Sequence, residues 1–244
     1  MMEPHPPQGA QAALRALRLL KLFTIERSEM SLGDLSAASG LNKTTAHRLL
    51  KALQSEGLIE RNSVTAWYSL GPVLMALGVQ ALASSNLRRR VRPVLKSLAN
   101  DTGETATLEV PIEDSMLILD EVTGRHVVSA AGNVGTRWPL HATSTGKAVL
   151  AFDEDGLARL AEPLEALTSK TLVKKGSFGP ELIDIRRRGY ATTVDELEDG
   201  FTAVATVIRG APGNIQGALS IGGPTHRLTS ARRAECGASL CKAA

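Results

Sequence analysis

The chain has few aromatic residues, with four Phe, two Tyr and two Trp among 244 residues. A surface that stacks the bases of single-stranded nucleic acid needs aromatic rings, so this composition argues against one. Only two cysteines are present, which excludes a disulfide scaffold, and a hydrophobic content of 43% excludes a disordered chain. This length predicts two modest domains or one large one, with a core built mainly from Leu, Val and Ala.

Long apolar runs are also missing. No stretch of about 18 uninterrupted apolar residues occurs, and the opening MMEPHPPQGA lacks the charged-then-apolar order of a signal peptide. We therefore expect a cytoplasmic protein without a membrane partner. Its Pro-rich first residues, 1–9, are expected to be a disordered lead-in.

The signatures of catalysis and metal binding are absent as well. The sequence has no G-x-S-x-G motif, no glycine-rich phosphate loop and no His or Cys at metal-ligand spacing. Cys236 and Cys241 have no His cluster around them and are expected to be free thiols. We predict no catalytic residues, no metal and no cofactor, and therefore no enzyme. A small hydrolase that uses His141 is the alternative.

Charge is present but unevenly distributed. Residues 1–96 hold 13 Lys and Arg against 6 Asp and Glu, a charge of +7, while residues 97–244 hold 15 against 19, a charge of −4. The formal net charge of +3 hides this division. A basic first part suits contact with a polyanion, and the rest of the chain suits a different task.

Two short helices are predicted in the basic part. Ser31 and Asp34 have the spacing of a capping box before the first helix, Gly40 can end it, and Asn42 can cap the second. The second helix has a core stripe of apolar residues, Ala46, Leu49, Leu50 and Leu53. Its other side is small, polar and cationic, and supplies the candidate DNA-binding residues Lys43, Thr44, Thr45, His47, Arg48 and Lys51.

The flanking segments complete a winged helix-turn-helix over residues 10–71. An amphipathic helix is predicted from about Gln11 to Ile25, with a core side formed by Ala13, Leu17, Leu20 and Phe23. After Gly57 the alternation of LIERN and WYSLG predicts a β-hairpin wing that packs through Leu58, Trp67, Tyr68 and Leu70. In such domains the second helix lies in the major groove of double-stranded DNA. Protein-interaction domains use the same elements and remain an alternative.

Residues 72–87, PVLMALGVQALASSNL, are apolar on most sides. A helix of this kind needs a covering surface, so we interpret it as a linker helix that helps to dimerise the chain. Packing against its own second domain is the alternative. The arginines of RRRVRP, at 88–93, begin the next helix and either contact DNA phosphates or pair with acids of the second domain.

Residues 88–244 predict a second domain of class α+β. Its expected strands are TATLEV, SMLILDEV, HVVSA, GYATTV, TAVATVI and GALSIGG, with PGN as the turn between the last two. Helical stretches lie between the third and fourth strands. Six strands with flanking helices favour a sensor-like domain.

Several motifs follow one another in order between about residues 10 and 240: SLGDLSAASGLNKTTAHRLLKALQSEGLI, YSLG, LDEVTG, PLHATSTGKAVLA, RRRGYATTVDELEDG, AVATVI and ALSIGGP. In this order and spacing they resemble the IclR (isocitrate lyase regulator) family of bacterial transcription regulators. The resemblance implies a winged-helix domain, a linker helix and a GAF-like effector-binding domain. It also implies dimers or tetramers whose DNA affinity is altered by a small molecule, often an organic acid from a catabolic pathway.

The PLHATSTGKAVLA motif predicts an anion site on physical grounds too. Thr143 to Thr145 stand at a helix start, so the amides of Ser144, Thr145 and Gly146 can face a carboxylate, aided by the helix dipole. Ordinary capping by Thr143 or Ser144 is the alternative, and the two are compatible. The resemblance implies that the amides of Ser144 and Thr145 bind an effector carboxylate, and that Ala203 and Ser220 line the same pocket.

Two departures from the family pattern bear on the effector. Thr193 stands where many members have an acidic residue, and Ala203 where many have Cys, so the pocket is less polar or less reactive there. Together with Trp138 and Leu119, they favour an aromatic or bulky carboxylate. The candidate effector-binding residues are Leu119, Trp138, Ser144, Thr145, Gly146, Thr193, Asp195, Glu196, Ala203 and Ser220.

The sequence thus predicts a lead-in over 1–9, a DNA-binding domain over 10–71, a linker helix over 72–87 and a GAF-like effector-binding domain over 88–244. The expected function is a regulator of a catabolic operon that binds operator DNA as a homodimer or dimer of dimers and responds to a small organic acid. A ligand-binding signalling module that acts through a protein partner is the alternative.

Overall fold

The computed structural model describes residues 10–24, 27–126, 134–210 and 214–244. The contacts divide the chain into two compact units, Met1–Ser84 and Ser85–Ala244, and each is described by itself. The lead-in over 1–9, residues 127–130 of the expected strand HVVSA and residues 212–213 of the PGN turn lie outside the described residues. No helix within the described ranges is long and apolar enough to cross a membrane.

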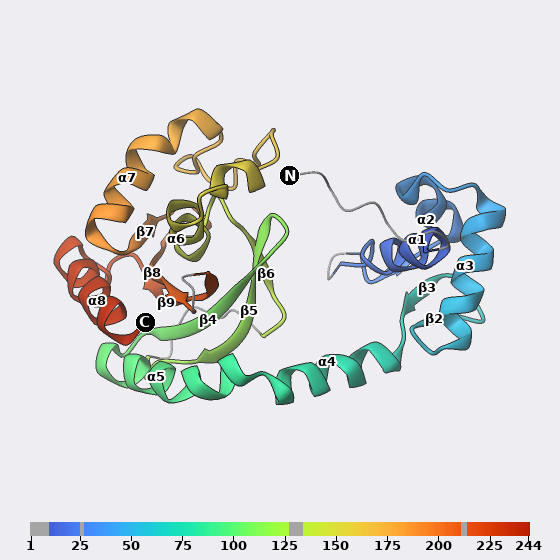
Figure 1. Cartoon of the computed structure of the whole chain (residues 1–244), viewed down its shortest axis with the longest axis horizontal. Helices are drawn as coiled ribbons and strands as arrows, with labels where there is room; N and C mark the ends of the chain where they lie inside the picture. The colour runs from blue at the N-terminus through green and yellow to red at the C-terminus, as the bar shows by residue number, and fades with distance from the viewer. Residues whose placement is uncertain (1–9, 25–26, 127–133, 211–213) are drawn as a thin grey trace. The chain divides into compact units, whose positions relative to one another are not determined.

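The first unit combines helices with a small sheet (Figure 1). Its helices are α1 (Gln11–Leu20), α2 (Leu32–Ser39), α3 (Lys43–Ser55) and α4 (Pro72–Ser84). Its strands are β1 (Glu29–Met30), β2 (Ile59–Arg61) and β3 (Tyr68–Leu70), paired antiparallel in the order β1-β3-β2.

Local hydrogen bonds set the bounds of α2 and α3 as predicted. The Ser31 hydroxyl accepts from the Asp34 amide at 3.1 Å, and the Asp34 carboxylate accepts from the Ser31 amide at 3.2 Å. Gly40 ends α2 in the left-handed conformation, at φ 66°. Asn42 Oδ1 then accepts from the Thr45 amide at 2.8 Å and starts α3. The helix-turn-helix prediction is confirmed.

The packing of this unit differs from the sequence prediction in three details. Helix α1 ends at Leu20, and its packing side holds the fully buried Leu19, while Leu17 is 53% exposed. After α1 the amides of Leu22 and Phe23 donate to the carbonyls of Leu19 and Leu20, and Phe23 is buried in the core, as predicted. Of the four residues predicted to pack the wing, Tyr68 is buried, Leu58 is half-buried, and Trp67 and Leu70 are each 45% exposed. Strand β1, only two residues long, was not predicted.

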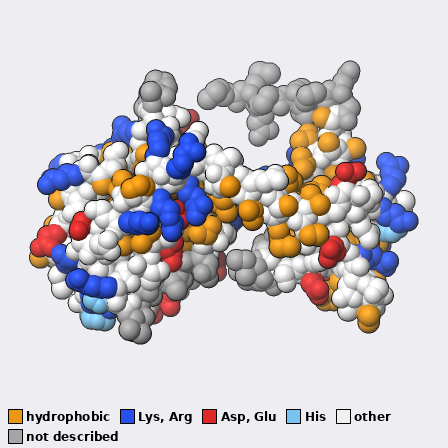
Figure 2. Space-filling view, turned by 90° about the horizontal axis from the view of Figure 1, so that it is seen from below, with side chains coloured by type: hydrophobic (Ala, Val, Ile, Leu, Met, Phe, Trp, Pro, Cys, Tyr) orange, Lys and Arg blue, Asp and Glu red, His pale blue; other side chains and the backbone are white. Residues whose placement is uncertain are grey.

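Helix α4 has no buried residue. Its apolar side chains reach the surface, where orange side chains mark this helix in Figure 2. The largest exposed ones are Val73, Met75, Leu77 and Val79, with exposed fractions from 38% to 69%. The described residues therefore leave an apolar helix without the covering surface that such a helix needs.

The second unit is built on a six-stranded sheet in which every neighbouring pair is antiparallel. Its strands, in the order β6-β5-β4-β9-β8-β7, are β6 (Arg137–Pro139), β5 (Ser115–Val122), β4 (Thr105–Ile112), β9 (Ile215–Pro224), β8 (Phe201–Arg209) and β7 (Ala191–Val194). Its helices are α5 (Asn86–Thr102), α6 (Ser144–Phe152), α7 (Gly179–Arg188) and α8 (Ser230–Ala243), with 3-10 turns at Gly156–Arg159 and Lys175–Ser177. The α+β prediction is confirmed, with β6 as the sixth strand.

Two apolar clusters cover the two faces of this sheet. On one face α5 and α8 pack on side chains such as Leu108, Val204 and Ile221. On the other face α6 and α7 pack on Met116, Val207 and their neighbours. The arginines at the start of α5 are partly used in this packing, because Arg88 and Arg92 pair with Asp120, which is 1% exposed.

Candidate functional site

Helix α3 presents the predicted DNA-binding face. Lys43, Thr44, Arg48 and Lys51 are exposed, and Thr45 and His47 are half-buried. The opposite side of the helix is anchored in the core by Ala46, Leu49, Leu50 and Leu53. All six candidate residues therefore lie on the solvent side of one rigid helix.

The second unit contains a cavity of about 130 Å³ between the sheet and the start of α6. Its walls come from β4, β5, β6, β7, β8 and β9, from the first turn of α6 and from the loop between β7 and β8. The lining residues are Thr105, Thr107, Glu109, Ile118, Glu121, Trp138, Thr143, Ser144, Thr145, Thr193, Leu197, Glu198, Phe201, Ala203, Ser220 and Gly222. None of these residues is Lys, Arg or His.

Strand register explains why residues far apart in sequence meet here. Thr105, Gly222, Ala203 and Thr193 are direct cross-strand partners in one row across four strands, and Thr107 is opposite Ser220 in the next row. Because side chains alternate across a sheet, Thr105, Thr107 and Glu109 share the cavity face, and the residues between them face α5 and α8.

The structure brings six of the ten predicted effector residues into the cavity lining and leaves four outside. The six are Trp138, Ser144, Thr145, Thr193, Ala203 and Ser220. The four are Leu119, Gly146, Asp195 and Glu196. The prediction that these four residues line the pocket is corrected, and each of them lies outside the lining for a local reason.

A β-bulge accounts for Leu119. Leu108 is paired with Asp120 and Glu109 with Ile118, so Leu119 is the extra residue on β5. It packs against the cluster under α5 and α8. The same bulge allows both Ile118 and Glu121, three residues apart, to line the cavity.

Gly146 serves packing. A Cβ at this position would lie 2.2 Å from the Leu140 carbonyl oxygen, so only glycine fits. Its amide donates to the Thr143 hydroxyl at 3.1 Å in an ordinary N-cap. Ser144 and Thr145 remain as the first-turn residues beside the cavity. The first turn of α6 is the positive end of the helix dipole.

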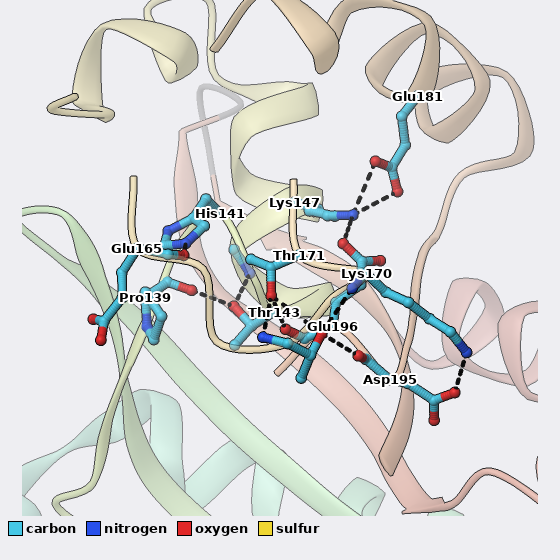
Figure 3. A network of polar contacts seen from close by, with 12 residues as sticks. Pro139, His141, Thr143, Lys147, Glu165, Lys170, Thr171, Glu181, Asp195 and Glu196 are labelled. Carbon is cyan, nitrogen blue, oxygen red and sulfur yellow. Dashed lines mark hydrogen bonds and ion pairs between the residues drawn. The ribbon is translucent and has the colours of Figure 1, made fainter. Parts of the chain in front are cut away.

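Asp195 and Glu196 belong to a network of ion pairs and hydrogen bonds and do not line the cavity (Figure 3). Lys147 of α6, only 1% exposed, pairs with Glu196 and, at 2.9 Å, with Glu181 of α7. Asp195 pairs with the exposed Lys170, whose hydrogen bond holds the pKa of the Asp195 carboxyl below its usual range. Burial raises the pKa of Glu196, while the charge of Lys147 opposes that shift. These acids hold the loop between β7 and β8, which supplies Leu197 and Glu198 to the lining.

Sequence reasoning missed the polar floor of the cavity. Glu109 is 5% exposed, and its two oxygens accept from the Thr107 hydroxyl at 2.8 Å and the Thr145 hydroxyl at 2.7 Å. The Thr107 and Ser220 hydroxyls are 2.7 Å apart. The Thr105 hydroxyl, on a residue 1% exposed, has no hydrogen-bond partner within the described part of the chain. Such a buried, unsatisfied group beside a cavity is expected where a ligand completes the bonding.

Two further observations bear on the alternatives. His141, the candidate base of a hydrolase, is buried, lies outside the cavity lining and contacts the Glu165 carbonyl oxygen through Nε2 at 2.9 Å. In the described ranges no three His, Cys, Asp or Glu side chains come together as a metal site.

Comparisons with known proteins cover both units. The model of the IclR helix-turn-helix domain matches residues 12–63, and that of the bacterial transcriptional regulator IclR C-terminal region matches residues 79–244. Transcriptional repressor IclR of Escherichia coli is 31% identical over 220 residues, which is 88% of this chain and 80% of that protein.

Solved structures share the fold over almost the whole chain. A putative IclR transcriptional regulator from a Silicibacter species has a TM-score of 0.85 and 31% identity, covering 95% of this chain and 92% of that one. An IclR homologue of Microbacterium hydrocarbonoxydans, crystallised with 4-hydroxybenzoate, has a TM-score of 0.71 and 24% identity, covering 95% and 98%.

The ion-pair network yields a test of stability. We expect Lys147→Met to lower the free energy of unfolding by about 3–5 kcal/mol, because it leaves two acids without their buried cation. The loss should shrink as the pH falls toward the raised pKa of Glu196, where that acid becomes neutral. Urea denaturation at several pH values measures both effects. The matched control is Lys170→Met, whose exposed pair should contribute much less. Equal losses for the two variants would contradict the assignment.

Proposed function

The chain belongs to the IclR family of bacterial transcriptional regulators, and we propose that it is a ligand-responsive regulator with a small organic acid as effector. It binds operator DNA through α3, takes the acid into the cavity beside α6, and catalyses no reaction. The observation that carries the effector half of this proposal is the cavity itself, where buried hydroxyls and the start of α6 converge on one space. Its place of action is the cytoplasm.

The DNA-binding half of the proposal rests on the cationic face of α3. Lys43, Arg48 and Lys51 are exposed on it, and the small Thr44 between them lets the helix approach a groove closely. The charge of +7 on residues 1–96 adds a sequence-independent attraction to phosphates. The proposed contacts are Lys43, Thr44, Thr45, His47, Arg48 and Lys51.

In the proposed effector site, the carboxylate of the acid binds at the first turn of α6. The amides of Ser144 and Thr145 and the helix dipole favour an anion there. The cavity volume is close to that of a cavity of about 150 Å³ that holds benzene, and Trp138 adds a flat apolar wall. These features favour an aromatic carboxylate, from a pathway whose operon the protein controls. The 4-hydroxybenzoate in the Microbacterium homologue guides the choice of probe compounds.

Homo-oligomerisation is proposed through α4. This helix is apolar around most of its surface, and none of its residues is buried within the described chain. A second copy of the same helix would cover it, and a two-fold dimer would present two α3 helices to a two-fold operator. A dimer of dimers remains compatible with this contact.

The DNA interface is tested by Arg48→Ala. We expect a loss of about 5- to 150-fold in affinity for the DNA upstream of the protein's own gene, because one good base contact contributes about 1–3 kcal/mol. Fluorescence anisotropy measures the affinity, and Gln54→Ala, exposed on the same helix, is the matched control. Wild-type affinity should also fall steeply with salt. An unaltered affinity in Arg48→Ala would reject this face, and a flat salt dependence would favour a protein partner.

The effector site is tested by filling the cavity. We expect benzoate, 4-hydroxybenzoate or a related aromatic acid to raise the melting temperature of the wild type more than pyruvate or succinate does, because only the native state binds. Ala203→Leu should abolish this shift and keep operator binding. Ala238→Leu, on the exposed side of α8, is the control. Shifts that survive in Ala203→Leu would place the acid elsewhere.

The proposed dimer contact is tested by Met75→Glu combined with Val79→Glu, one helical turn apart. Burying two like charges against a second copy is costly, so sedimentation velocity should show a smaller species than the wild type. Ile183→Glu, which replaces a side chain 62% exposed on α7, is the control. A wild type that sediments as a monomer, or a double variant that keeps the wild-type mass, would refute the contact.

A further inference from the structure

The carboxyl of Glu109 lies at the centre of a chain of hydroxyl groups. Thr107 donates to one of its oxygens and Thr145 to the other, at 2.8 and 2.7 Å. The Ser220 hydroxyl lies 2.7 Å from that of Thr107. Three of these four residues come from the sheet, and Thr145 comes from the first turn of α6, so the chain runs across the cavity floor to the proposed carboxylate site.

Counting protons defines what this floor offers to a ligand. When Glu109 is ionised, Thr107 and Thr145 each use their only hydroxyl proton to bond it. Ser220 must then donate to Thr107, which has no proton left for Ser220. The three hydroxyls therefore turn only lone pairs toward the cavity. An acceptor such as a carboxylate finds no donor among these three hydroxyls, and in the described floor the unpaired Thr105 hydroxyl alone keeps its proton for a ligand.

A proton on Glu109 reverses this polarity. The neutral carboxyl donates to Thr145 or Thr107, which releases one hydroxyl proton of the chain toward the cavity. The proton comes from solvent and ends on a carboxyl oxygen of Glu109. A carboxylate ligand then meets a donor and no longer faces a second negative charge at short range.

No other charged group of the described cavity lining offsets the negative charge of an ionised Glu109. The other titratable residues of the lining are Glu121 of β5 and Glu198 of the loop before β8, both acids. Lys147 of α6 is committed to Glu181 and Glu196. Strands β6, β7, β8 and β9 contribute no titratable side chain to the lining. Burial raises the pKa of Glu109, against the lowering effect of the Thr145 and Thr107 hydrogen bonds.

We propose that Glu109 determines the ligand specificity of this cavity by admitting a carboxylate only when its own carboxyl carries a proton. In its ionised form the same floor accepts hydrogen-bond donors, such as the amide group of a neutral ligand. This inference rests on the proposed function, since it concerns how the effector acid is bound. It makes Glu109 a partner in binding, because Glu109 takes up one proton from solvent for each acid molecule that binds.

Matched acids and amides test the proposal. Benzoate and benzamide, and 4-hydroxybenzoate and 4-hydroxybenzamide, differ only in charge and donor capacity. Between about pH 6 and about pH 8 the acids themselves stay ionised, so a single proton taken up at Glu109 weakens their binding by up to about tenfold per pH unit. The amides should show no such change. Isothermal titration in buffers of different ionisation enthalpy counts the proton directly.

Single substitutions identify the residue that takes up the proton when an acid binds. Glu109→Gln keeps the shape and can donate to the hydroxyl chain, so its affinity for the two acids should be the same at both pH values and should exceed the wild-type affinity at the higher one. Glu235→Gln, on the surface of α8, should behave as the wild type. A pH dependence that disappears in Glu121→Gln or Glu198→Gln instead, or acid binding by the wild type that is equal at both pH values, overturns the proposal.

A measurement without ligand guards against a variant that misfolds. A raised pKa of Glu109 in the folded state means that wild-type stability falls as the pH rises from the unfolded-state pKa to the folded-state one. Glu109→Gln should therefore melt at a higher temperature than the wild type at about pH 8, with a smaller gap at about pH 5. A variant that melts at a lower temperature than the wild type at both pH values overturns the proposal.

If no acid binds either protein while operator binding persists, the organic-acid effector fails and this inference fails with it. If acids bind without pH dependence, only the inference fails.

Discussion

The second unit depends on the alternation of side chains across one antiparallel sheet. On β4 the odd-numbered residues 105, 107 and 109 are polar and face the cavity, while Ala106 and Leu108 face α5 and α8. Strand β9 repeats the pattern with Ser220 facing the cavity and Leu219 and Ile221 facing the core. A slip of one residue would exchange the two faces and bury the polar set under the helices. The core and the binding site are therefore fixed by the same register.

The polar face of that sheet is stabilised by hydrogen bonds and ion pairs. Glu109 is satisfied by two hydroxyls, and Lys147, buried on α6, is satisfied by acids from α7 and from the loop before β8. Burying such groups without partners would cost several kcal/mol. The satisfied network holds the first turn of α6 and the loop with Leu197 and Glu198 around one space. The cavity is thus preformed, which lowers the ordering cost of binding a small ligand.

Local signals carried most of the sequence prediction, and long-range packing accounts for its errors. Helix α3 was predicted with its N-cap and buried stripe because Asn42 caps an amide three residues on, and Leu49 and Leu53 repeat at the spacing of one helical turn. The place of Leu119 was wrong because a bulge between two strands shifts the alternation. Asp195 and Glu196 were misplaced because their cations, Lys170 and Lys147, are distant in sequence. Glu109 was overlooked, although the alternation in TATLEV places it on the same side as two threonines.

The proposed function requires that one small molecule in the cavity of the second unit controls the DNA affinity of the first. Thermodynamic linkage provides the test: operator affinity is measured with and without a saturating aromatic acid, and acid affinity with and without saturating operator. Both affinities are expected to change, in the same direction and by the same factor, of about 5–150-fold for a typical coupling. An acid that binds in the cavity while the operator affinity stays constant would contradict the proposed function.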